Sequence, residues 1–448
     1  MNNLKKQILS VAVATSTVLS CVPVSMAAIP ADVQGTRYEE PVQILSALNI
    51  MVGDENGAYR LDDTIIRSEV AKMAIHALGL EDAAESSKGQ TMFDDVSAEH
   101  WANGYINLAV SQGIIEGDGD GNFRPNAPIS YAEAMTIMVR ATGYTVSAEE
   151  NGGYPHGYMK TGTSNGLAKN VQGSYSDKIS RGNVAYLTTN ALESKLMEQT
   201  GFGSDGKYEI TEKTLLKDKL KVTKDTGRIT AIENTSLTGS SSLAKGQIKI
   251  DNKTYETAYN MNNLLGYNVT YYVKNEGKND ESVILAMPIQ NQNNDLTISS
   301  ELFSKLTTKN GNTAIEYFKD ENTSKTNTAE ISSDATLIYN GKYQAMDKNL
   351  IDLTDKSGNI TLLDSNKNGK YDIVFVKNYE NIVVDSVSST GKIVDKYSQK
   401  MLKLDDTVDF RITKGLEEIS VSDLVEYDVL SVAASLDKKL YEVEVTNK

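Results

Sequence analysis

The sequence is short of the residues from which disulfide scaffolds and many catalytic sites are built. Its 448 residues include one cysteine, three histidines and one tryptophan. It contains no phosphate-binding loop, no His-Glu-x-x-His motif and no cysteine nucleophile. We therefore predict that the protein is not an enzyme. A glycosidase needs only two carboxylates, and with 60 acidic residues a carbohydrate-active enzyme stays open as an alternative.

The N-terminal apolar run, from Ile8 to Val24, is interrupted by serines and threonines and is short for a membrane span. It follows two lysines and precedes Ser25-Met26-Ala27, an order that is typical of a secretory signal peptide. We predict that 1–27 is the signal peptide, so that cleavage removes Cys21 and leaves a protein without disulfides or a membrane segment. A lipidated Cys21 is the alternative, although Leu19 fits that pattern poorly.

Basic residues are outnumbered throughout, with 45 lysines and arginines against 60 aspartates and glutamates and a net charge of −15. Removal of the predicted signal peptide leaves 43 against 60, a net charge of −17. Such a field repels nucleic acid and anionic surfaces. We therefore expect no nucleic-acid partner, and any anionic wall polymer must be bound by local basic residues.

The most informative stretch that is present runs from Phe93 to Tyr144 and predicts two helices joined by a loop. The first helix is expected over 101–112, and residues 117–122 are too rich in Gly and Asp to continue it. Ser130 and Glu133 have the spacing of a capping box, which predicts the start of the second helix. The apolar stripe of this second helix is Ala134, Ile137, Met138 and Ala141.

Four motifs in this stretch, taken in order, resemble the S-layer homology (SLH) domain. They are Phe93-x-Asp95-Val96, Trp101, the loop Gly119-Asp120-Gly121-Asn122-Phe123-Arg124-Pro125, and the helix start Ile129-Ser130-Tyr131-Ala132-Glu133. Ser130 keeps the capping hydroxyl of the family's Thr. Tyr131 departs from the family, which has an Arg there, and this predicts a weak or inactive binding groove.

Two further copies of the pattern are predicted from a shared register, in which Glu69, Glu133 and Asn183 occupy the same helix position. The first copy has Ile66-Arg67 at the helix start and lacks the Phe-x-Asp-Val and Trp motifs. The third has Ser180-Arg181. The resemblance implies three copies, at 37–90, 91–150 and 151–200, that pack as one pseudo-threefold unit.

Beyond the third copy the composition changes to strand-forming and turn-forming residues, which is typical of an all-β region. We predict a linker at 201–206 and three small β-barrel or sandwich modules, at 207–290, 291–378 (the divergent one) and 379–448. The predicted fold class is therefore α+β multidomain, with a helical SLH triplet followed by β modules.

Candidate binding residues follow from the resemblance, which implies that Arg67 and Arg181 line grooves for a pyruvylated secondary cell-wall polysaccharide. Arginine suits a carboxylate because its planar fork donates two parallel hydrogen bonds. Trp101 could stack on a sugar, or it could be a core residue. Exposed arginines that merely pair with nearby acids are the simpler alternative. The residues implied at this site are Arg67, Glu69, Asp95, Trp101, Glu133 and Arg181.

A second candidate site is the segment 364–372, whose oxygen-bearing side chains alternate as at the start of a calcium loop. The candidate ligands are Asp364, Asn366, Asn368, Lys370 through its carbonyl, and Asp372. Phe375 stands where such a loop needs a glutamate. A β-hairpin with an Asn368-Gly369 turn explains the same pattern, so calcium stays possible and no other cofactor is expected.

The functional hypothesis is a secreted protein held at the cell wall by its SLH copies, with the β modules as a structural or adhesive part of a surface layer. The expected partners are the wall polysaccharide and further copies of the chain. A wall-anchored carbohydrate-active enzyme or carbohydrate-binding protein is the alternative.

Overall fold

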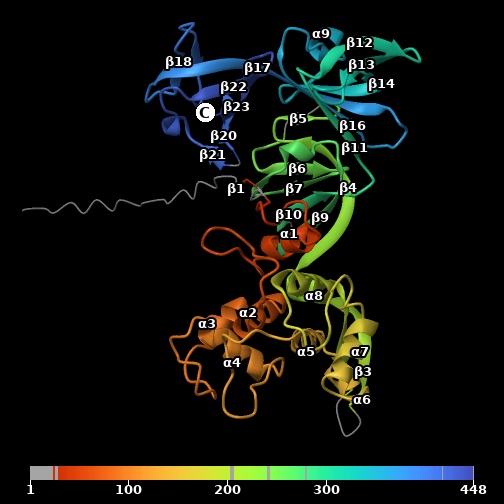
Figure 1. Cartoon of the computed structure of the whole chain (residues 1–448), viewed down its shortest axis with the longest axis vertical. Helices are drawn as coiled ribbons and strands as arrows, with labels where there is room; N and C mark the ends of the chain where they lie inside the picture. Colours follow the sequence, from red (N-terminus) through yellow and green to blue (C-terminus); the bar gives the residue numbers. More distant parts are fainter. Residues whose placement is uncertain are drawn as a thin grey trace, which may run out of the picture.

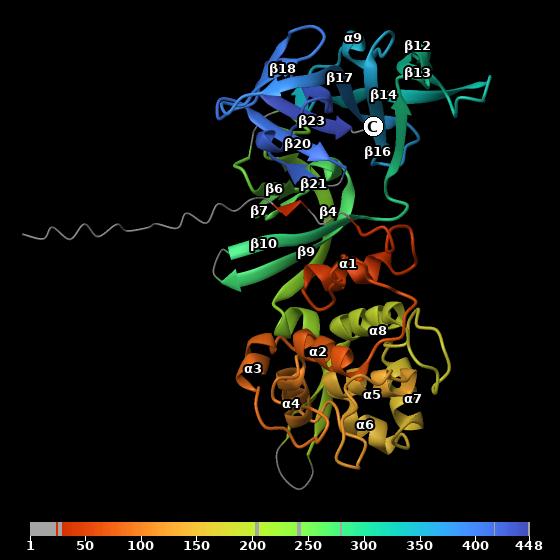
Figure 2. The same ribbon diagram turned by 60° about the vertical axis from the view of Figure 1, so that its left-hand side comes forward.

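The computed structural model describes residues 24–25, 29–201, 206–239, 243–277, 280–415 and 417–446. Helices occupy one end of the elongated molecule and strands the other (Figure 1). Helix α1 (Glu39–Ala47) lies next to strands β9 (Asn268–Gly277) and β10 (Asp280–Pro288), between the two ends (Figure 2). The predicted α+β order, helices first and strands after, is confirmed. The predicted signal peptide lies outside the described residues apart from Val24–Ser25, a short strand β1 that pairs with β8.

The helical end is built from short amphipathic helices. Among the described residues none is long and apolar enough to cross a membrane. The helices are α1 (Glu39–Ala47), α2 (Arg67–Ala77), α3 (Glu81–Ser86), α4 (Asn103–Ser111), α5 (Tyr131–Ala141), α6 (Thr145–Glu150), α7 (His156–Ser164) and α8 (Arg181–Glu193).

The helix starts agree with the predicted caps. At α5, Ser130 Oγ accepts from the Glu133 amide at 3.3 Å, and Glu133 Oε2 accepts from the Ser130 amide at 2.7 Å. This reciprocal pair satisfies two N–H groups that a first helical turn leaves free. At α8 the Ser180 hydroxyl accepts from the Asn183 amide at 3.3 Å. At α2, where Ile66 has no hydroxyl, only the Glu69 half remains.

Three isoleucines tie the helical copies together through a closed ring of backbone hydrogen bonds. The Ile129 amide donates to the Ile65 carbonyl (3.1 Å), Ile179 to Ile129 (3.0 Å), and Ile65 to Ile179 (3.2 Å). All three side chains are buried. The helices pack in the same cyclic sense, since α2 lies against α4, α5 against α7, and α8 against α1.

The segment predicted as a linker has a different place in the fold. Strands β2 (Lys195–Gln199) and β3 (Tyr208–Thr214) pair antiparallel at the helical end, so the predicted linker lies between two paired strands and not between two domains. Within this predicted linker, 202–205 lie outside the described residues. The chain enters the β region later, through the short π-helix η1 (Leu215–Lys219).

The passage between the two ends is packed rather than open. Leu215, Leu216 and Val222 belong to the same buried apolar cluster as the helices, together with Tyr272 and Leu285 of the first β module. Because apolar side chains at a shared core resist separation, the helical end and the first β module form one continuous packed unit.

The first β module is a sheet closed on itself. Its strands pair in the order β4-β6-β7-β10-β9, and β9 pairs back to β4. The strands of this module are β4 (Val222–Ile232), β5 (Thr235–Ser236), β6 (Gln247–Ile250), β7 (Lys253–Glu256), β8 (Tyr259–Asn260), β9 (Asn268–Gly277) and β10 (Asp280–Pro288), with the 3₁₀ turn η2 (Asn262–Leu264).

The second module repeats the pairings of the first. Strands β16 and β17 form a hairpin as β9 and β10 do, and β14 runs parallel to β17 as β7 does to β10. Its elements are β11 (Asn294–Ser299), β12 (Phe303–Lys309), β13 (Asn312–Phe318), β14 (Thr326–Tyr339), β15 (Lys342–Gln344), α9 (Lys348–Ile351), β16 (Ser357–Asp364) and β17 (Tyr371–Val387).

The third module has the same hairpin and the same parallel pairing, of β20 with β23. Its elements are β18 (Lys392–Asp395), β19 (Met401–Lys403), β20 (Asp409–Lys414), β21 (Glu417–Ile419), η3 (Val421–Asp423), β22 (Val429–Ala434) and β23 (Leu440–Thr446). Strand β17 is shared, because it pairs with β16 at one end and with β22 at the other. The boundary predicted at 378/379 therefore falls inside a continuous strand.

Candidate functional site

Arg67 is buried at the start of α2 and bridges two helical copies. Its Nε donates to the Phe123 carbonyl (2.9 Å), Nη2 to the Glu116 carbonyl (2.9 Å), and Nη1 to Glu133 Oε1 (3.0 Å). Only 6% of the residue is exposed. Asp118 Oδ1 lies 3.9 Å from Nη2. Arg67 therefore clamps the Gly-rich loop and the next helix cap of the second copy.

Arg181 makes the corresponding contacts one step around the ring. Its Nε donates to the Tyr59 carbonyl at 2.8 Å and its Nη1 to Glu69 Oε1 at 2.6 Å. Its Nη2 lies 3.5 Å from the Val52 carbonyl. Arg181 thus clamps the loop and helix cap of the first copy, as Arg67 clamps those of the second. The structure thus brings four of the candidate residues together as two pairs, Arg67 with Glu133 and Arg181 with Glu69.

The third junction has neither charge. Tyr131 stands in the arginine position and is buried, and Asn183 stands in the glutamate position. The backbone contacts persist, since the Tyr131 amide donates to the Asp177 carbonyl at 2.9 Å. Asn183 instead accepts from the Gln172 amide at 3.2 Å. This junction keeps the scaffold of the other two without their ion pair.

The electrostatics of the Arg67 junction favour an ionised Glu133. Burial raises the pKa of this carboxyl group, but the hydrogen bonds from Ser130 and the charge of Arg67 lower it by more. The pKa of Glu133 therefore lies below its usual value. Since Glu133 caps α5 and pairs with Arg67 at once, the helix start and the junction depend on the same charge.

Asp95 holds the Gly-rich loop from the other side. Its two carboxylate oxygens accept from the amides of Phe123 (2.8 Å) and Arg124 (2.7 Å). The first copy has an equivalent that sequence reasoning missed, because Asp32 Oδ2 accepts from the amides of Tyr59 and Arg60. The dipeptide Asp32-Val33, compared with Asp95-Val96, was the available signal. Asp95 is thus a positioning residue.

Trp101 is exposed at 48% of its surface, so the core alternative for this residue is wrong. It stacks against His100, with ring centroids 5.8 Å apart. A second exposed aromatic, Tyr154, lies close to Ser130, Glu133 and Arg67. The pKa of its hydroxyl group is raised, because partial burial and the charge of Glu133 outweigh the opposite effects of Ser130 and Arg67.

Tyr154 was also missed as a site residue. The signal was the alignment of Trp101-Ala-Asn-Gly-Tyr105 with Tyr154-Pro-His-Gly-Tyr158, which share a glycine and a tyrosine at the same offsets. Helices α4 and α7 begin at the same position of this alignment. The two exposed aromatics therefore lie at equivalent positions, each two residues before the start of a helix.

One catalytic-looking pattern is explained by the fold. Residues 162–166 read Gly-Thr-Ser-Asn-Gly, which has the spacing of a nucleophile elbow. In that motif the serine lies on a turn between a strand and a helix. Ser164 instead ends α7. The pattern therefore gives no support to an enzymatic function.

The predicted calcium segment forms the turn of the β16–β17 hairpin. Asp364 Oδ2 accepts from the Gly369 amide (3.0 Å), and the side-chain oxygens of Asn366 and Asn368 accept from amides two residues ahead (3.1 and 2.8 Å). Asp372 accepts from Ser365. The segment is therefore the turn of a β-hairpin, as the alternative predicted, and this turn is also an ordered loop rich in side-chain oxygens.

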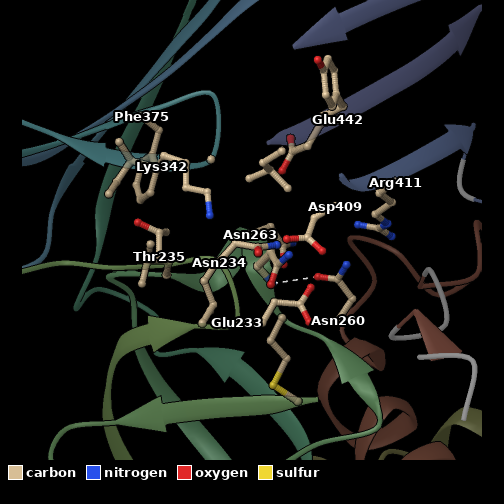
Figure 3. A pocket seen from close by; sticks show the side chains of 18 of the residues that line it. Glu233, Asn234, Thr235, Asn260, Asn263, Lys342, Phe375, Asp409, Arg411 and Glu442 are labelled. Atoms are coloured by element: carbon tan, nitrogen blue, oxygen red, sulfur yellow. Dashed lines mark hydrogen bonds between the residues drawn. The ribbon is translucent and has the colours of Figure 1, made fainter. Parts of the chain in front are cut away.

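A cavity of about 600 Å³ lies where the three β modules meet. Figure 3 shows Glu233 and Asn263 from the first module, Lys342 and Phe375 from the second, and Glu442 from the third around it. Several of the charged lining residues pair with each other, as Lys377 does with Glu442 at 2.9 Å and Arg411 with Glu418 at 3.0 Å. The cavity walls therefore present both signs of charge.

Comparison with known proteins identifies the helical end. Residues 31–71 and 93–135 match the S-layer homology domain family. The chain therefore carries SLH domains, as the motifs in 93–135 predicted. The first match begins before residue 37 and includes Asp32.

Two relatives that match more than half of the chain are surface proteins by name. The chain is 29% identical over 314 residues to the middle cell wall protein of Brevibacillus brevis, which covers 62% of this chain and 30% of that protein. It is 28% identical over 441 residues to the cell surface protein of Thermoanaerobacter kivui, which covers 95% of this chain and 52% of that protein. The chain thus spans between about a third and a half of the length of these relatives.

Proposed function

We propose that the helical end anchors the protein to the cell wall by binding a secondary cell-wall polysaccharide, and that the β modules form a structural part of a surface layer. The protein is an extracellular, wall-associated surface protein, in keeping with its SLH domains and with relatives named as cell wall and cell surface proteins. The polysaccharide, its pyruvate groups and self-association in a layer are parts of the proposal.

The observation that carries the proposal is the junction built twice around a buried arginine. An arginine has five N–H donors, and the contacts of Arg67 with Phe123, Glu116 and Glu133 use three of them. The two other donors belong to its terminal nitrogens, and in this proposal they bind an anionic ligand. An anionic sugar substituent suits such a planar donor pair.

We infer that 151–200 is a third, degenerate SLH copy and that the three copies have pseudo-threefold symmetry. The closed ring of backbone bonds through Ile65, Ile129 and Ile179 supports this inference. The cyclic packing of α2 on α4, α5 on α7 and α8 on α1 supports it independently. By this symmetry, Trp101 belongs to the groove of Arg181, as Tyr154 belongs to that of Arg67.

Exposed aromatics give the proposal its sharpest test, because their removal leaves the arginine clamps intact. Trp101→Ala should weaken co-sedimentation of the protein with purified cell walls by at least about tenfold, or ~1.4 kcal/mol. A sugar face stacked on an indole ring would be lost, while the helix stays folded. Tyr397→Ala, which removes a 79% exposed aromatic from the third β module, is the matched control.

The same walls are then tested after chemical removal of the secondary polymer. Loss of binding on polymer removal, together with loss in Trp101→Ala and not in Tyr397→Ala, is the expected result. Binding that survives polymer removal would overturn the proposed ligand. Equal binding by both variants would exclude the Trp101 groove.

A further inference from the structure

The turn between β16 and β17 contains a buried carboxylate oxygen that the protein itself does not satisfy. Asp364 is only 3% exposed. Its Oδ2 accepts from the Gly369 amide, but Oδ1 is buried and has no hydrogen-bond partner among the described residues. A buried, unpaired carboxylate oxygen destabilises a fold unless a cation or donor meets it. This oxygen therefore points to a ligand.

The neighbouring groups supply further hard oxygen ligands. The side-chain oxygens of Asn366 and Asn368 each accept one amide hydrogen bond, which leaves the second lone pair of each oxygen available. The carbonyl of Lys370 follows at the position where a loop of this spacing supplies a backbone ligand. The Lys370 ammonium is held by Glu330, 3.0 Å from Oε1.

We propose that Asp364, Asn366, Asn368 and the Lys370 carbonyl bind a calcium ion, with water completing the coordination. Calcium accepts six to eight oxygen ligands in irregular geometry, whereas magnesium demands a regular octahedron. Within the described ranges, no three or more His, Cys, Asp or Glu side chains form a cluster that could hold a metal ion. The proposed site therefore combines one carboxylate with amide and carbonyl oxygens. With one carboxylate and no bidentate glutamate, its Kd should lie at about 10⁻⁴ to 10⁻³ M.

The loop also lies where the first and second β modules touch. Asp372 Oδ2 accepts from Arg228 Nη2 at 2.8 Å, and the Ser365 carbonyl accepts from Asn268 Nδ2 at 2.7 Å. Arg228 and Asn268 belong to β4 and β9 of the first module. A calcium ion that orders 364–372 therefore stiffens the contact between two modules.

Terbium luminescence tests the site directly. Tb³⁺ takes the place of Ca²⁺ in oxygen sites and is excited through a nearby tyrosine, here Tyr371. The full-length secreted protein, freed of metal with EGTA, should show a tyrosine-sensitised signal that Ca²⁺ displaces and equal Mg²⁺ does not. Asp364→Asn should weaken Ca²⁺ competition by at least about tenfold, because ligand charge sets affinity.

Two further variants keep the test decisive. Asp320→Asn is the control, since Asp320 is an exposed carboxylate that accepts from the Asn322 amide in another hairpin turn, whereas Asp364 is buried. Asn366→Ala removes a ligand from an exposed position, so it should lose affinity without loss of folding even if Asp364→Asn misfolds. Equal Ca²⁺ affinity in wild type and Asn366→Ala, or no competition by about 10 mM Ca²⁺, above the weakest range for such sites, would overturn the proposal.

Amide hydrogen exchange tests the role at the junction. Ca²⁺ should slow exchange in 364–372 and also in 264–269, the segment of the first module that contains Asn268. Slower exchange in the loop alone would overturn the coupling of the two modules.

Discussion

Two junctions of the helical end keep a buried arginine paired with a partly exposed glutamate, and the third does not. Arg67 with Glu133 and Arg181 with Glu69 lie at 3.0 and 2.6 Å, whereas Tyr131 and Asn183 replace both partners of the third pair. The backbone bonds are alike at all three. A buried arginine without its partner would be costly, and the third junction avoids this cost because neither charge is present there.

The largest expected effect comes from breaking a clamp that is present. Arg67→Ala or Arg181→Ala should each destabilise the protein by about 3 kcal/mol, because a glutamate and two loop carbonyls lose their donor. Urea unfolding of the purified protein measures this. Arg124→Ala, an exposed arginine on the same loop, is the control and should cost less than about 1 kcal/mol. A loss below that value at Arg67 would mean that the clamp is not structural.

Building the missing clamp gives the next largest effect. Tyr131→Arg alone should destabilise the protein because its charge is buried without a partner. Adding Asn183→Glu should recover about 1–2 kcal/mol, measured as the coupling energy of a double-mutant cycle. A coupling energy near zero would show that the third junction has drifted too far to hold an ion pair.

Removal of the capping serines should change the stability less than removal of the arginines, and by different amounts at the two junctions. Ser130→Ala should cost about 1–2 kcal/mol, since it breaks a reciprocal cap, whereas Ser180→Ala should cost about 1 kcal/mol, since its cap is one-sided. Thermal unfolding of both variants under one buffer condition makes the comparison. A larger loss of stability in Ser180→Ala than in Ser130→Ala would show that the cap at Ser130 does not gain stability from the pairing of Glu133 with Arg67.

The pH dependence should be the smallest signal. The pKa of Glu133 is lowered in the folded state, so its stabilisation is present above its ordinary pKa and is lost as the pH falls through the folded value. Wild type should therefore exceed Glu133→Gln in stability at about pH 6 and approach it at about pH 3. Parallel curves across that range would show that Glu133 carries no such linkage.

The sequence predicted the helical end better than the β end. Capping motifs, a glycine-rich loop and 3.6-residue apolar spacing are local features, so the helices around Ser130 and Ser180 could be located from residues alone. Strand partners are set by contacts far apart in the chain. This is why three β modules could be predicted from the sequence, but not that β17 is one strand shared between two of them.

The candidate site shows the same division. The identities of Arg67, Arg181, Glu69 and Glu133 as candidates followed from the resemblance of their helix starts to the SLH motif. Their pairing across different copies, the burial of both guanidinium groups and the proximity of Tyr154 depend on the packing of separate helices.

By itself, the sequence determined where helices begin, which copies carry the charged pair, and which side chains in 364–372 alternate as oxygen ligands, because each depends on neighbours within a few residues. Only the tertiary structure decided that each arginine clamps the next copy, that Trp101 is exposed, and that Asp364 Oδ1 is buried without a partner. Burial and long-range pairing are properties of the packed chain, and no local pattern specifies them.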